Sequence, residues 1–156
     1  MSPELGRRVA WAAGAALAVG AAALVAVVLS GRPPEGPVAV DWDGVRCARC
    51  GMLVSDPAYA AQLHRSDGVV RHYDDPGCLL ADLAESGADD LHAVWLHHHR
   101  EPRWIPLEEA AFVRVPHSPM GYGLGVVSAG ESGDALDLER ARALVAQRAT
   151  SRGAPQ

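Results

Sequence analysis

An uncharged stretch of twenty-two residues, Val9–Ser30, limits what the chain can fold into. As a helix, this stretch would be about 33 Å long, which matches the hydrocarbon core of a bilayer. A signal peptide usually has an apolar core of only about 7–15 residues and a small-x-small cleavage site. Leu29–Arg32 fits such a site poorly, and no cysteine directly follows that could carry a lipid. We therefore expect residues 9–30 to be a retained transmembrane anchor, with a cleaved signal peptide as the alternative.

Arginines flank this stretch unevenly. Arg7 and Arg8 precede it, and only Arg32 follows closely. The positive-inside rule then places residues 1–8 in the cytoplasm and the rest of the chain outside the cytoplasmic membrane. We expect residues 31–40 to be a proline-rich linker, of which Arg32–Pro37 is stiff and extended and has no role in packing.

The rest of the chain is long enough for one small domain. We expect this domain to span residues 41–147, followed by a disordered polar tail over residues 148–156. The chain has fourteen arginines, no lysine and nineteen acidic residues, which gives a net charge of −5. No basic stripe is available to neutralise phosphates, so the composition argues against nucleic acid as a partner.

Apolar alternation and turn residues predict a domain of mixed helices and strands. The pattern predicts a helix that begins at Pro76, ends near Ser86, and is bounded by Asp75 as N-cap and by Gly87. A last helix is expected with Asp134 as its N-cap. The predicted strands are Tyr59–His64, Val69–Tyr73, Ala93–Leu96, Phe112–Val115 and Leu124–Val127.

Three sulfur-bearing side chains lie within the segment Cys47-Ala48-Arg49-Cys50-Gly51-Met52. Thiolate and thioether sulfur favour Cu(I), and thiolates also suit zinc and iron–sulfur clusters. In an extended segment, Cys50 and Met52 would face the same side and could hold one ion together. The motif is also compatible with a redox-active pair of Cys47 and Cys50. Such a pair normally opens a helix, and no helix is expected here.

Further candidate ligands lie outside this segment. Met120 lies in a loop of proline and glycine rather than on an apolar stripe, which makes it a candidate thioether ligand, and His117 is a candidate nitrogen donor nearby. Cys78 falls in the first turn of the predicted first helix, as a thiolate or as a small buried residue. Together with His72 it could complete a Cys3His zinc site. We interpret His97–His99 as a solvated strand end.

Taken in order, these motifs resemble the NosL family, the accessory proteins of nitrous-oxide reductase that bind copper on the outer face of the cytoplasmic membrane. The resemblance spans about Arg46 to Leu144. It rests on the cysteine motif, Ala60-Ala61-Gln62, Tyr73-Asp74-Asp75, Gly77-Cys78, Trp104-Ile105, Ala110–Val113 and Pro119-Met120-Gly121-Tyr122-Gly123.

The resemblance implies an α+β fold of two ββαβ-like modules, similar to the organomercurial lyase family, after the N-terminal anchor. It implies a non-enzymatic metallochaperone that delivers Cu(I) to the apoprotein of a copper enzyme, nitrous-oxide reductase, in company with an ABC-type transporter. Cys50, Met52 and Met120 match the family's sulfur ligands, Cys47 matches a subset of members, and Cys78 is a further candidate. Many members are lipoproteins, whereas this chain has the anchor instead. A weaker resemblance is to YHS- and TRASH-type metal modules, so a structural zinc module stays as an alternative.

Overall fold

The computed structural model describes residues 19–20, 31–87 and 90–153. The chain divides into two compact units, Met1–Arg32 and Pro33–Gln156. Apart from residues 19–20, the predicted anchor lies outside the described residues, as does the predicted cytoplasmic segment. Within the described ranges, no helix combines the length and apolar character that a membrane span requires.

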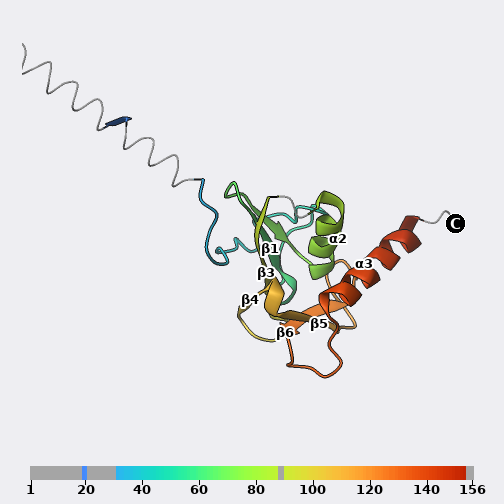
Figure 1. The fold of residues 1–156 in the computed structure, drawn as a ribbon. Coiled ribbons are helices and arrows are strands. Elements are labelled where there is room, and N and C mark those ends of the chain that lie inside the picture. Colours follow the sequence, from blue (N-terminus) through green and yellow to red (C-terminus); the bar gives the residue numbers. More distant parts are fainter. Residues whose placement is uncertain (1–18, 21–30, 88–89, 154–156) are drawn as a thin grey trace, which may run out of the picture. The chain divides into compact units, whose positions relative to one another are not determined.

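The second unit is built on an antiparallel sheet with the strand order β2-β1-β3-β4 (Figure 1). A separate hairpin pairs β5 with β6. Helix α2 follows β2, and helix α3 follows the hairpin and packs against both α2 and β5. The strands are β1 (Ala61–Arg65), β2 (Val70–Tyr73), β3 (Leu91–His97), β4 (Trp104–Pro106), β5 (Ala110–Arg114) and β6 (Leu124–Ser128). The helices are α2 (Pro76–Ser86) and α3 (Leu138–Gly153), with single helical turns at η1 (Pro57–Tyr59) and η2 (Leu107–Glu109).

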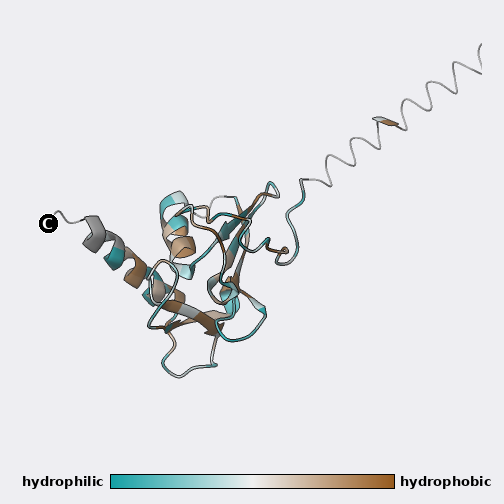
Figure 2. Ribbon diagram, turned by 180° about the vertical axis from the view of Figure 1, so that it is seen from behind, coloured by the Kyte–Doolittle hydropathy of each residue, from teal (hydrophilic) through white to brown (hydrophobic). Residues whose placement is uncertain are grey.

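Helix α2 covers one face of the four-stranded sheet. Ala61 pairs with Tyr73 across β1 and β2, so their side chains share a face. The Tyr73 hydroxyl donates a hydrogen bond to Asp82 on α2, and Arg71 forms an ion pair with the same carboxylate at 2.8 Å. These contacts identify the α2 side of the sheet as the core side. Hydrophobic residues line β5 and β6 in the second half of the core (Figure 2).

The predicted mixed fold is confirmed, and α2 begins and ends where the sequence places it. Asp75 accepts a hydrogen bond from the Gly77 amide, and Gly87 ends the helix with a φ of 72°. The last helix differs from the prediction. It begins at Leu138, and its cap is Asp137, whose carboxylate accepts a hydrogen bond from the Arg140 amide, rather than Asp134.

Helix α3 also continues to Gly153, so residues 148–153, predicted as a disordered tail, are helical. The first predicted ββαβ module is present as β1-β2-α2-β3. The second consists of β5, β6 and α3, and no strand follows α3 among the described residues.

The chain is attached to the sheet at Val38, near the end of the proline-rich linker. Gln62, on the face of the sheet opposite α2, is fully buried. Its side-chain amide donates to the Val38 carbonyl at 2.7 Å and accepts from the Val38 amide at 2.9 Å. A glutamine distant in sequence thus holds Val38, the residue directly after the segment Arg32–Pro37 for which no packing role was predicted.

The three consecutive histidines are also not a solvated strand end. His97 and His98 are buried, and the His97 ring packs edge-on against Trp104. The Nδ1 atom of His98 accepts hydrogen bonds from the amides of Arg100 and Glu101, which satisfies the turn after β3. These rings therefore serve the fold, and their burial could not be deduced from local alternation.

The Gln62 clamp can be tested by Gln62→Leu. Because the Val38 amide and carbonyl lose both partners, we expect the unfolding free energy to fall by about 1–2 kcal/mol and hydrogen exchange at the Val38 amide to become faster. Urea unfolding and amide exchange measure the two effects. Gln147→Leu, an exposed change on α3, is the control, expected within about 0.5 kcal/mol of the wild type. Unchanged exchange at Val38 would contradict the clamp.

Candidate metal centre

The cysteine motif folds into a tight turn rather than an extended segment. The Gly51 amide donates to the Cys47 carbonyl at 3.0 Å, and the Cys47 amide donates to the Met52 carbonyl at 2.8 Å. Gly51 has a φ of 75°, a conformation that side-chain-bearing residues rarely adopt. The prediction that Cys50 and Met52 share the face of an extended segment was therefore wrong. Because Cys47 and Cys50 lie in a turn, neither has the helix-start position typical of a redox cysteine.

Three segments bring four potential ligands together. Cys47 and Cys50 come from the turn, Asp74 directly follows β2, and Cys78 lies in the first turn of α2. Their ligand atoms all lie within 4.8 Å of one another. We call these residues the Cys3Asp cluster. Cys47 is 3% exposed and Cys78 1%, whereas Cys50 is only partly buried and gives the cluster an edge toward solvent.

Backbone amides and thiols distribute charge unevenly over the cluster. Hydrogen bonding from the Cys78 thiol, helped by the amides of Cys50 and Asp74, lowers the pKa of Cys47 against the effect of its burial. The pKa of Cys78 is raised because its proton is shared with Cys47 and because it is buried. Burial is also the main reason that the pKa of Cys50 is raised. The hydrogen bonds thus favour loss of a proton from Cys47 over loss from Cys50 or Cys78.

Asp74 was not among the predicted ligands, yet it completes the cluster. Its side chain is 3% exposed, and both of its oxygens lie 3.4 Å from the Cys50 sulfur. Burial raises the pKa of Asp74 to about 6. The signal for it is present in the sequence: two consecutive aspartates precede Pro76, and only one of them can be the N-cap of α2.

The two predicted methionine ligands lie in different surroundings. Met52 is 58% exposed beside the turn. Met120 is half-buried, and its amide donates to the Asp75 carboxylate at 2.9 Å. Since Asp75 adjoins Asp74, the Met120 loop is held next to the segment that carries the cluster.

The predicted nitrogen ligands are not part of the Cys3Asp cluster. His72 pairs with Gln62, so its side chain lies on the sheet face opposite α2, away from Cys78. His117 is exposed, and only its carbonyl is engaged, by the Tyr59 hydroxyl. A Cys3His site with His72 is therefore not formed, and the side chain beside the three sulfurs is the carboxylate of Asp74.

A second group of potential ligands, His98, Glu101 and Glu131, is a closed hydrogen-bond network. Because Nδ1 of His98 accepts two backbone amides, Nε2 carries the hydrogen and donates it to Glu131 at 3.0 Å. Arg103 forms ion pairs with both glutamates. No lone pair of the imidazole is available for a cation, so we assign this group a structural role.

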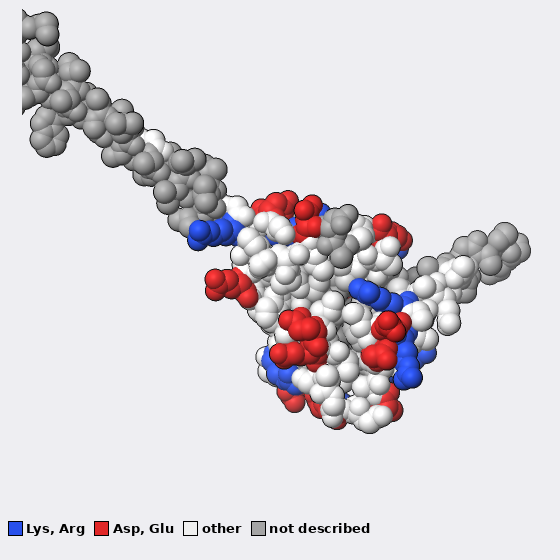
Figure 3. All heavy atoms as spheres, viewed as in Figure 1, with Lys and Arg blue, Asp and Glu red and all other residues white. Residues whose placement is uncertain are grey.

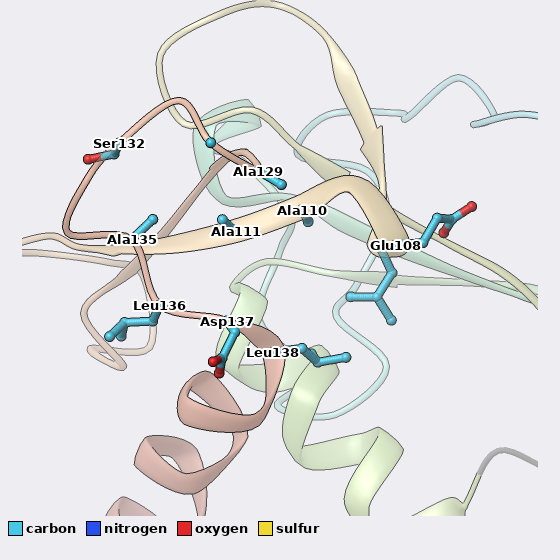
Figure 4. Close-up of a pocket in the computed structure, with 11 residues that line it drawn as sticks. Glu108, Ala110, Ala111, Ala129, Ser132, Ala135, Leu136, Asp137 and Leu138 are labelled. Atoms are coloured by element: carbon cyan, nitrogen blue, oxygen red, sulfur yellow. The ribbon is translucent and has the colours of Figure 1, made fainter.

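A pocket of about 400 Å³ lies near the start of α3 (Figure 4). Its lining is mainly small and apolar, with Glu108, Ser132 and Asp137 as the polar side chains. None of its lining residues belongs to the Cys3Asp cluster. We therefore assign this pocket no part in metal binding.

No protein-family model and no curated protein matches the sequence. Among solved structures, the fold is similar to the crystal structure of the copper chaperone NosL from Shewanella denitrificans. The two chains are 22% identical, with a TM-score of 0.54, and the match covers 74% of this chain and 89% of that chain. The likeness confirms the mixed α+β, NosL-like fold that the sequence resemblance implied.

The buried carboxylate predicts a pH dependence of the metal-free, reduced protein. The pKa of Asp74 is raised to about 6 in the folded state, so its protonated form stabilises the fold at low pH, and this stability is lost as the pH rises through 6. Between pH 4 and 7, we expect the unfolding free energy of Asp74→Asn to rise by about 2–3 kcal/mol relative to that of the wild type. Urea unfolding across this range measures the gain. Glu108→Gln, a change at an exposed residue, is the control. A difference in unfolding free energy between Asp74→Asn and the wild type that does not change with pH would contradict the raised pKa of Asp74.

Proposed function

We propose that this protein is a non-enzymatic metallochaperone that binds one Cu(I) ion at the Cys3Asp cluster. The observation that carries the proposal is the convergence of three cysteine sulfurs from two separate segments within 4.8 Å. Thiolates are among the ligands that select Cu(I). The similarity of the fold to a copper chaperone supports the same conclusion.

The hydrogen bonds of the cluster give a route for binding. The pKa of Cys47 is the one that its surroundings lower, so this sulfur would make the first bond to the incoming ion. The remaining sulfurs must lose their protons to bind, and metal binding therefore releases protons. Asp74 lies 3.4 Å from the Cys50 sulfur and is positioned to accept that proton and pass it to solvent. In this account, Asp74 moves a proton rather than binding Cu(I), because a carboxylate oxygen suits harder cations.

The exposed edge of the cluster suits transfer to another protein. Cys50 is only partly buried, and the neighbouring Met52 is largely exposed. A thiol of the recipient can then approach the ion from this side while Cys47 and Cys78 still hold it. We propose Met52 as a transient thioether ligand during this exchange and Met120 as a further ligand from the adjoining loop.

We further propose where the protein works and with which partners. Residues 9–30 would anchor it in the cytoplasmic membrane, with the cluster on the outer side. The recipient would be the apoprotein of a copper enzyme, nitrous-oxide reductase in denitrification, with an ABC-type transporter as a further partner. On the face shown in Figure 3, acidic and basic groups are interspersed, which suits a protein partner better than nucleic acid.

A structural zinc site is the second candidate, and Asp74 is the observation that favours it. Three thiolates and one carboxylate match the tetrahedral ligand set of zinc. Structural zinc sites usually contribute most of the folding energy of the segments they hold. Here, however, the surrounding core is formed by the sheet and both helices, which stabilise the fold apart from the cluster. This favours a site that fills and empties without unfolding.

Anaerobic competition with a chromophoric Cu(I) chelator tests the proposal. The wild type should bind one Cu(I) per chain, and Cys50→Ser or Cys78→Ser should weaken binding by more than about a hundredfold, since loss of outer contacts alone costs 10–100-fold. Met52→Leu tests the thioether and should weaken binding too. Leu53→Ala, a change at the neighbouring exposed residue, is the control and should not. Wild-type affinity in Cys78→Ser, or binding of Zn(II) with no retention of Cu(I), would contradict the proposal.

A further inference from the structure

Arg49 ties the cysteine turn to helix α2. It lies between Cys47 and Cys50, and its guanidinium forms a two-pronged ion pair with Glu85, with nitrogen–oxygen distances of 2.6 and 2.8 Å. Glu85 lies in the last turn of α2, whereas Cys78 lies in the first. The pair therefore joins the two segments that supply the three sulfurs of the cluster.

Tyr122 adds the Met120 loop to the same contact. The Tyr122 side chain also interacts with the Arg49 guanidinium and, after Glu85, helps to raise the pKa of Arg49. The Tyr122 ring packs directly on Gly77, where an added Cβ would lie only 2.1 Å from the ring. One guanidinium thus contacts α2 and the Met120 loop while its own backbone belongs to the cysteine turn. We call Arg49, Glu85 and Tyr122 the latch.

Metal binding affects the latch differently from the other contacts of the cysteine turn. The hydrogen bonds from Cys78 to Cys47 and from Cys50 to Asp74 depend on thiol protons, which leave when an ion binds. The Ala48 amide bonds to the His72 carbonyl at 2.8 Å, which holds the turn to β2 but not to α2. The Arg49–Glu85 pair needs no thiol proton, so the loss of these protons does not remove it.

The latch is also accessible from outside. Arg49 and Glu85 line a groove of about 410 Å³ between α2 and α3, and the Glu85 side chain is 68% exposed. An ion pair in this setting is weak enough to open without unfolding the protein.

We propose that Arg49 is a positioning residue and that the latch sets the rate at which the ion leaves the cluster. With the latch closed, the turn and α2 stay together and all three sulfurs reach the ion. With it open, the turn separates from Cys78 and the ion is held by fewer sulfurs. This inference rests on the proposed binding of Cu(I) at the Cys3Asp cluster.

The test follows release of Cu(I) from the loaded, full-length protein to excess chromophoric chelator by stopped-flow absorbance. Arg49→Ala and Glu85→Gln should each release Cu(I) about fivefold faster, the scale of one partly exposed ion pair. The release rate of Arg49→Lys should lie between those of the wild type and Arg49→Ala, because lysine keeps the charge but cannot bind both carboxylate oxygens at once. Arg49→Glu combined with Glu85→Arg should restore slow release. The thiolate-to-metal absorption of the loaded variants should stay that of the wild type.

The matched control is Arg65→Ala. Arg65 forms an ion pair with Asp90 in which the side chains are 28% and 74% exposed, compared with 23% and 68% for Arg49 and Glu85. Arg65 is the last residue of β1. The first, Ala61, pairs with Tyr73, the residue before Asp74, and lies about 13 Å from Arg65 along the strand. Removal of this pair should leave the release rate unchanged.

The outcomes separate the two proposals. A wild type that retains no Cu(I) overturns the proposed function itself. A wild type that retains Cu(I), with Glu85→Gln releasing it at the wild-type rate, overturns the latch alone. Equal acceleration by Arg65→Ala would also overturn it, since the effect would then reflect general loosening of the fold.

Discussion

Asp75 is fully buried, and its carboxylate accepts hydrogen bonds from two segments far apart in the sequence. One oxygen accepts from the Gly77 amide and fixes the start of α2, which places Cys78. The other accepts from the Ser118 hydroxyl and the Met120 amide, which brings in the second loop. Asp74 is then left free to face the cysteine turn. The site depends on this division of work between two adjacent aspartates.

Local chemistry explains which elements could be predicted. Helix α2 was placed correctly because Asp75, Pro76 and Gly87 supply a cap, a first turn and a stop that act within a few residues. The hairpin of β1 and β2 follows from alternation and a turn in the same way. The attachment of Val38 and the burial of His97 and His98 could not be predicted, because partners such as Gln62 and Glu131 are distant in sequence. The N-cap of α3 was assigned to the wrong one of two nearby aspartates: Asp137 accepts from the Arg140 amide, whereas Asp134 accepts from the Ser132 hydroxyl.

In the candidate site, too, local features could be predicted and contacts between distant segments could not. Residue type and spacing were sufficient to select the three cysteines, which the fold brings together. Asp74 was missed because a carboxylate before a helix has the default role of a cap, and only the structure shows that Asp75 already fills it. The relation of Cys50 to Met52 was wrong because Gly51 turns the chain where an extended segment was assumed. Arg49 carried no sequence signal, since its importance comes from Glu85 on another element.

The central claim is that sulfurs from the cysteine turn and from α2 converge on one ion. X-ray absorption at the copper edge, on Cu(I)-loaded wild type and Cys78→Ser, tests it most directly because it counts the neighbours of the metal. The account predicts a shell of sulfur atoms that includes all three cysteines in the wild type and has one sulfur fewer in the variant. A shell dominated by nitrogen or oxygen, or a sulfur count unchanged by Cys78→Ser, would contradict it.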